Sequence, residues 1–68
     1  MPTIRVELFE GRTPEQKAAL AREITDACVR VLGGSADGVD VLFVDVPRSN
    51  WATGGVLWSQ RPPAKPAG

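Results

Sequence analysis

Pro2 is the residue of this chain that most clearly could perform chemistry, because it directly follows the initiator methionine. A small residue at this position usually lets the cell remove Met1, and the Pro2 nitrogen would then be a secondary amine held in a rigid ring. Such an amine can move a proton from one substrate atom to another if its pKa lies near the working pH. If Met1 is retained, the nitrogen is an amide and cannot act as a base.

A catalytic Pro2 would need a particular environment. An ordinary α-amino group titrates at about 7.7–8.0, and the secondary amine of free proline is more basic. Removal from water and a nearby cation both lower the pKa of an amine, because both disfavour its protonated form. The folded chain must therefore enclose Pro2 in apolar walls beside a positive charge.

Two strands are predicted around this position. Residues 3–9 (TIRVELF) alternate between apolar and other side chains, which is the two-residue period of a half-buried strand. Gly11 in the turn that follows can adopt a positive φ. Residues 39–46 (VDVLFVDV) are apolar on both faces in the middle, which is typical of a strand that is covered on both sides.

A helix is predicted between the two strands. Thr13 can cap its first turn, Pro14 suits the first helical position, and Gln16 completes a capping box. Gly33 and Gly34 end the helix through a left-handed cap. An apolar stripe at helical spacing should face the sheet, with its cysteine in the core; it comprises Leu20, Ile24, Ala27, Cys28, Val31 and Leu32.

The order strand, helix, strand implies parallel pairing through a crossover. One helix covers only one face of a two-stranded sheet, so the other face needs a partner. Pro47 ends the second strand, residues 48–55 read as a loop, and residues 54–58 (GGVLW) resemble a hairpin arm after a glycine turn. We expect an α+β fold: a single β-α-β unit with a C-terminal β-hairpin, whose two parallel strands are completed into a larger sheet by obligate oligomerisation.

Length and composition restrict the classes of function. The 68 residues make one domain, which we place at residues 1–60 and follow with a poorly ordered, proline-rich tail at 61–68. Eight basic and eight acidic residues cancel, so no basic field would attract nucleic acid. One cysteine and no histidine give neither an internal disulfide nor a metal-binding pattern. Without a signal peptide or a membrane-spanning run, we expect no membrane partner and a cytoplasmic protein.

Three features together resemble the 4-oxalocrotonate tautomerase family. They are the proline after Met1, the LFEGRTPEQK passage at residues 8–17, and the PRSNWATGG passage at residues 47–55. The resemblance covers about residues 2–60. It implies a β-α-β fold with a C-terminal hairpin, dimers that share a four-stranded sheet, and association of the dimers into homohexamers. It also implies keto–enol tautomerisation of small 2-oxo acids without a cofactor or metal, with the amino-terminal proline as general base and acid.

The resemblance also implies roles for particular residues of this chain. Pro2 would transfer the proton, and Arg12 would bind the substrate carboxylate through two parallel hydrogen bonds and stabilise charge on an enolate oxygen. Trp51 would exclude water from the pocket and help to lower the pKa of the amine. The backbone near Phe9 would contact the substrate oxygen.

Asp40 departs from the family pattern, because well-known members carry a second arginine at this position. A carboxylate here would repel a second substrate carboxylate, which favours a monoacid such as an arylpyruvate enol. Arg48 and Arg61 are candidate replacements by their place in the chain. Asp40 could instead activate water, which would change the reaction to hydration or dehalogenation of an unsaturated acid.

Each of these residues also has a structural explanation. Pro2 could serve only to permit methionine removal, Arg12 could be a solvated turn residue, Trp51 could fill a subunit interface, and Asp40 could be a surface carboxylate. Trp58 is expected to serve packing rather than function, and the pair Gly54 and Gly55 reads as a turn rather than a phosphate loop.

Three functions remain open at this point. The first is a cofactor-independent tautomerase, and the second is a hydratase or dehalogenase that uses Pro2 and Asp40. The third is a catalytically silent subunit of a hetero-oligomer.

Overall fold

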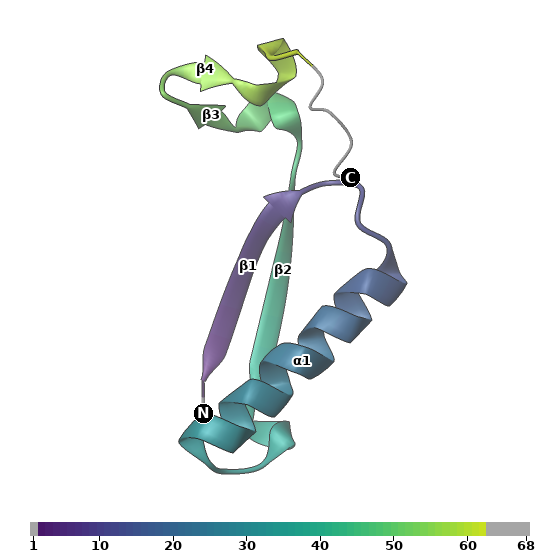
Figure 1. Cartoon of the computed structure of the whole chain (residues 1–68), viewed down its shortest axis with the longest axis vertical. Coiled ribbons are helices and arrows are strands. Elements are labelled where there is room, and N and C mark those ends of the chain that lie inside the picture. The colour runs from purple at the N-terminus through teal and green to yellow at the C-terminus, as the bar shows by residue number, and fades with distance from the viewer. Residues whose placement is uncertain (1, 63–68) are drawn as a thin grey trace.

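A computed structural model of the chain describes residues 2–62, and the predicted β-α-β unit with a C-terminal hairpin is confirmed (Figure 1). Three short 3₁₀ turns, at Ala36–Gly38, Arg48–Asn50 and Trp58–Gln60, were not predicted. Within the described residues, no helix is long and apolar enough to cross a membrane. In chain order the elements are β1 (Thr3–Phe9), α1 (Pro14–Leu32), β2 (Asp40–Val46), β3 (Ala52–Thr53) and β4 (Val56–Leu57).

Strands β1 and β2 pair in parallel along their whole length, from Thr3 opposite Asp40 to Phe9 opposite Val46. The second strand begins one residue later than predicted, because the Val39 N–H closes the preceding turn on the Ala36 carbonyl. Alternation along the strands gives the sheet two faces. The face toward α1 carries Ile4, Val6, Leu8, Val41, Phe43 and Asp45, and the opposite face carries Thr3, Arg5, Glu7, Phe9, Asp40, Leu42, Val44 and Val46.

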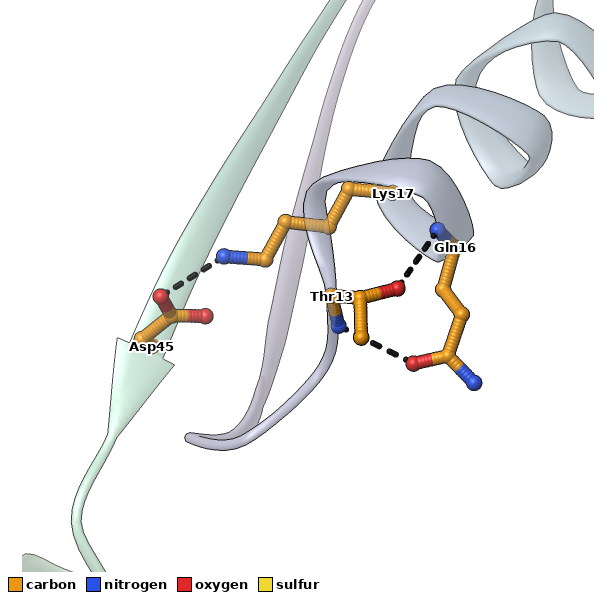
Figure 2. A network of polar contacts seen from close by, with 4 residues as sticks. All are labelled: Thr13, Gln16, Lys17 and Asp45. Atoms are coloured by element: carbon orange, nitrogen blue, oxygen red, sulfur yellow. Dashed lines mark hydrogen bonds and ion pairs between the residues drawn. The ribbon is translucent and has the colours of Figure 1, made fainter.

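The start of α1 is held by the predicted capping box (Figure 2). The Thr13 hydroxyl accepts from the Gln16 N–H at 3.1 Å, and the Gln16 side chain accepts from the Thr13 N–H at 3.0 Å. In the first turn, Lys17 Nζ lies 2.7 Å from Asp45 Oδ2 and joins the helix to the end of β2. These contacts set the position of the loop between β1 and α1.

The end of α1 only partly follows the expectation. Gly33 and Gly34 both have positive φ, 82° and 87°, and the Gly33 N–H donates to the Val29 carbonyl, but the Gly33 ψ of −174° is not that of the predicted left-handed cap. The apolar stripe, however, does not stay against the sheet over its whole length, because Val31 is 75% exposed and Leu32 is 68% exposed. Two strands separated by about 4.8 Å make a sheet too narrow to cover all of a 19-residue helix.

The hairpin turns at Gly54 and Gly55, whose φ values of 62° and 84° suit a two-residue turn. Thr53 is held twice: the Trp58 indole N–H donates to its hydroxyl at 2.8 Å, and Arg61 Nη2 donates to its carbonyl at 2.7 Å. Arg61, where the predicted tail begins, is therefore attached to the hairpin. Residues 63–68 of that tail lie outside the described residues.

The described part of the chain has no buried side chain at all. Cys28, expected in the core, is only half-buried, and Leu42 on the sheet face opposite α1 is 52% exposed. Burial of apolar surface is the main favourable contribution to folding. A chain without a closed core of its own is consistent with the predicted oligomer, which stays a prediction at this point.

Candidate active site

Pro2 and Asp40 lie at the same end of the sheet. Pro2 directly precedes β1, and its carbonyl accepts a hydrogen bond from the Asp40 N–H at 3.0 Å. Pro2 is half-buried and Asp40 is exposed. The contact between these two residues is this backbone hydrogen bond.

The predicted aromatic residues meet at the other end of β1. The rings of Phe9 and Trp51 have centroids 4.6 Å apart at an interplanar angle of 55°. Trp58 meets the Phe9 ring edge to face at 5.5 Å. Phe9, Trp51 and Trp58 form a cluster that joins the hairpin region to the end of β1; such tilted and edge-to-face contacts are favourable for aromatic pairs.

Arg12 lies at this same end, together with Arg48. Both line a cavity of about 190 Å³, which we call the arginine cavity; its other lining residues are Phe9, Glu10 and Gly11. The Arg48 guanidinium lies over the Phe9 ring, 4.5 Å from its centroid. Arg12 is exposed and also borders a smaller cleft of about 110 Å³ between α1 and the sheet.

Arg61, the other candidate replacement for the missing family arginine, contacts the hairpin region instead. Its guanidinium lies 4.5 Å from the Trp58 ring centroid, and one nitrogen donates to the Thr53 carbonyl. It does not line the arginine cavity. Of the two candidates, Arg48 is the one that lines the arginine cavity with Arg12.

Trp51 lines a third and larger cavity, of about 310 Å³. Its other lining residues are Glu7, Val46, Asn50 and Ala52. Glu7 and Val46 belong to the sheet face opposite α1. Trp51 thus belongs to the aromatic cluster and also borders the sheet face opposite α1.

A single chain does not bring the predicted site residues together. Pro2 and Asp40 lie at the start of the strands, whereas Phe9, Arg12 and Trp51 lie at or beyond their ends (Figure 1). The seven residues of β1 span about 20 Å at a rise of about 3.3 Å per residue. This separation follows from the strand length, which was already readable in the sequence.

No metal centre is apparent in the described part of the chain, since residues 2–62 hold no group of three or more metal-ligating side chains. Apart from the Lys17–Asp45 ion pair at the end of β2, Asp40 lies near Pro2 at one end of the strands, and Arg12 and Arg48 lie with Glu10 at the other. The far end can bind a carboxylate. The near end carries Pro2, whose nitrogen is a basic secondary amine only if Met1 is removed.

Comparison with known sequences points to one family. The family profile described as a tautomerase enzyme matches residues 2–61. A probable tautomerase of Streptococcus pneumoniae serotype 4 is 49% identical over 51 residues, which are 75% of this chain and 85% of the relative. The 2-hydroxymuconate tautomerase of Comamonas testosteroni is 39% identical over 56 residues, 82% of this chain and 89% of the relative.

Solved structures agree with the sequence comparisons. A 4-oxalocrotonate tautomerase homologue matches with a TM-score of 0.84 and 41% sequence identity. The match covers 93% of this chain and 100% of the homologue's chain. A heterohexameric 4-oxalocrotonate tautomerase from Chloroflexus aurantiacus J-10-fl has a TM-score of 0.82 and 32% identity, with coverage of 88% and 97%. Because the profile match spans nearly the whole described chain and the fold agrees, this chain belongs to the 4-oxalocrotonate tautomerase family of tautomerase enzymes.

Proposed function

We propose that this protein is a cofactor-independent keto–enol tautomerase that acts on a small 2-oxo acid or its enol. After removal of Met1, the neutral Pro2 amine takes the enol O–H proton, and the electron pair of that bond forms the carbonyl. The C=C electron pair then takes a proton back from the Pro2 ammonium at carbon. The net change is an isomerisation, and the amine returns to its starting state.

The observation that supports this proposal best is the family match that includes Pro2 together with Arg12. Arg12 borders a cavity of suitable size for a carboxylate and its neighbouring atoms. A guanidinium binds a carboxylate through two parallel hydrogen bonds and stabilises enolate charge. Trp51, against Phe9 beside this cavity, is proposed to exclude water.

We further propose that each active site is shared between subunits. Pro2 and Arg12 lie at opposite ends of a strand about 20 Å long, and no small 2-oxo acid reaches across that distance. An oligomer built from dimers, and most simply a homohexamer, would place the Pro2 end of one subunit beside the Arg12 end of another. Such an assembly would also cover the open sheet face around Leu42.

The first experiment combines intact mass measurement with substitution of Pro2. The purified protein should lack Met1 and should tautomerise phenylenolpyruvate, with 2-hydroxymuconate as a poorer substrate because Asp40 disfavours a second carboxylate. Pro2→Ala should lower kcat by at least about 100-fold, since a positioned general base contributes about 10²–10⁴-fold. Circular dichroism and size-exclusion chromatography should show an unchanged fold and assembly.

The same experiment separates the competing functions. A correctly processed Pro2→Ala protein with full activity would refute the role of Pro2. Native protein that always retains Met1 would instead support a silent subunit that assembles beside an active partner, as in a hetero-oligomer.

A second candidate function comes from the backbone contact between Pro2 and Asp40, whose N and O atoms lie 3.0 Å apart. Here protonated Pro2 would donate to carbon while Asp40 takes a proton from water, so that water adds across an activated double bond. Hydration or hydrolytic dehalogenation of an unsaturated acid would result. Assays of both reactions on one preparation distinguish this function from tautomerisation.

A further inference from the structure

We propose that Arg48 is a second substrate-binding guanidinium, which holds the 2-oxo or enolate oxygen while Arg12 holds the adjacent carboxylate. This inference rests on the proposed tautomerase function and names its substrate class more closely. The site would select a 2-oxo acid over a simple carboxylic acid of the same size.

Charge is the first argument. Arg12 and Arg48 line the arginine cavity together with a single carboxylate, that of Glu10. Among residues 2–62 the ion pairs are Arg5 with Glu7 and Lys17 with Asp45, so neither cavity arginine is neutralised by a direct pair. The cavity therefore keeps a net positive charge that suits an anionic ligand.

The second argument is that Arg48 is held in place before any ligand arrives. It follows Pro47, whose φ is −66°, and opens a 3₁₀ turn closed by a 2.8 Å hydrogen bond from the Asn50 N–H to the Pro47 carbonyl. Its guanidinium lies over the Phe9 ring, with Cζ 4.5 Å from the ring centroid, and it makes no side-chain hydrogen bond within residues 2–62, so its N–H groups are available to a ligand. Less side-chain entropy is then lost on binding.

The third argument is the chemistry of a 2-oxo acid. Such a molecule presents a carboxylate next to a carbonyl oxygen, and this oxygen becomes negative when a proton leaves the neighbouring carbon. One planar guanidinium matches the carboxylate, and a second can donate to the adjacent oxygen. Donors aimed at an oxygen where charge develops lower the barrier of the reaction.

Among residues 2–62, no arginine or lysine other than Arg12 and Arg48 lines the arginine cavity. Arg61 stacks on Trp58, donates to the Thr53 carbonyl and lies outside the cavity lining. Asp40 carries the opposite charge and lies at the Pro2 end of the sheet. The carboxylate and the 2-oxo oxygen of the substrate should therefore bind at the arginine cavity. The rest of the substrate should be uncharged, for example an aryl ring.

The test compares two ligands that differ mainly in the 2-oxo group: phenylpyruvate and 3-phenylpropanoate. Their dissociation constants are measured by titration calorimetry on the assembled protein. Arg48→Met removes the guanidinium but keeps a side chain that packs on an aromatic ring. It should weaken phenylpyruvate binding at least about tenfold, as expected for a lost hydrogen bond from a charged group, and 3-phenylpropanoate binding less than about twofold.

Two further variants complete the comparison. Arg22→Met removes the same charge from an exposed position on α1 and should bind both acids like the wild type. Arg12→Ala should weaken both acids, because both carry the carboxylate. If Arg48→Met does not fold, Arg48→Gln allows the same two-ligand comparison.

Several results would overturn the inference. Equal weakening of both acids by Arg48→Met would mean that Arg48 contributes general charge only, and no weakening of either acid would mean that it does not touch the substrate. In both cases tautomerase activity that depends on Pro2 would still stand. A wild-type protein that binds neither acid and turns over no enol would instead refute the proposed function itself.

Discussion

At the residue scale, Asp40 is proposed to restrict the substrates that Pro2 could serve. Its backbone is joined to Pro2 by a hydrogen bond, and its exposed carboxylate stands near the amine end of the sheet. Like charges a few ångströms apart repel by about 1–4 kcal/mol, depending on how much water lies between them. Asp40 should therefore weaken the binding of a dicarboxylate and have little effect on the binding of a monoacid.

Replacement of this charge gives a specific prediction. Asp40→Asn should raise kcat/KM for 2-hydroxymuconate about tenfold, because a repulsion of about 1.4 kcal/mol is worth a factor of ten, and should leave phenylenolpyruvate turnover nearly unchanged. The measurement is steady-state kinetics on both substrates. Asp37→Asn, on the exposed 3₁₀ turn Ala36–Gly38, removes the same charge nearby and is the matched control.

Two other results for Asp40→Asn would assign Asp40 a different role. If Asp40→Asn lowers kcat for hydration about 100-fold while kcat for tautomerisation is unchanged, the carboxylate activates water and the second candidate function is correct. If neither activity changes on any substrate, Asp40 is structural only.

Phe9 illustrates how one side chain links several parts of the site. It contacts both tryptophans of the aromatic cluster and supports the Arg48 guanidinium. The sequence resemblance assigned only its backbone a role, as a contact to the substrate oxygen. Its ring has the structural role of fixing the wall of the arginine cavity.

At the scale of secondary structure, the start of α1 determines where Arg12 stands. Arg12 is the residue directly before the cap Thr13, so the capping box and the Lys17–Asp45 ion pair hold the loop that carries it. An exposed ion pair of this kind contributes little to stability, at most about 1 kcal/mol. The cap is therefore the more promising contact to test.

Thr13→Ala should lower the free energy of unfolding by about 1 kcal/mol per chain, because it leaves the Gln16 N–H without its partner. The chain provides its own control in Ser35, which precedes the 3₁₀ turn Ala36–Gly38 and makes no side-chain capping bond. Ser35→Ala should have almost no effect. Denaturation by urea at one fixed protein concentration measures both, since the stability of an oligomer depends on concentration. Equal losses in the two variants would show that the cap contributes nothing.

At the scale of the whole molecule, assembly and activity should be inseparable. The described chain has no closed core, and Leu42 and Val31 expose more than half of their surface. A monomer that leaves so much apolar surface in water is poorly stabilised. Subunit contacts would supply both the missing core and the missing half of each site.

Shared sites predict that two inactive variants can rescue each other. Pro2→Ala and Arg12→Ala subunits, unfolded and refolded together, should regain roughly a quarter of the wild-type activity, because about that share of randomly mixed sites joins an intact Pro2 to an intact Arg12 from another chain. Each variant refolded alone should stay inactive. Absence of rescue in oligomers shown by native mass spectrometry to be mixed would place both residues in one subunit's site and contradict the sharing.

Local sequence patterns account for the secondary-structure elements of this protein and their order. The strand at residues 3–9, the helix between Thr13 and Gly33 and the glycine turn of the hairpin all follow from rules that act over a few residues: side-chain alternation, capping and positive φ. The length of the first strand also determined that Pro2 and Arg12 lie far apart.

The contacts between side chains that are distant in the sequence could not be predicted and are seen in the folded chain. Arg48 and Arg61 were equivalent candidates in the sequence, and the fold of the segment after β2 places Arg48 on Phe9 and Arg61 on Trp58. It also left Val31 and Leu32 exposed, although their spacing matched the rest of the helical stripe. Such contacts depend on how distant segments pack and on how wide the sheet is, and local patterns carry no information about either.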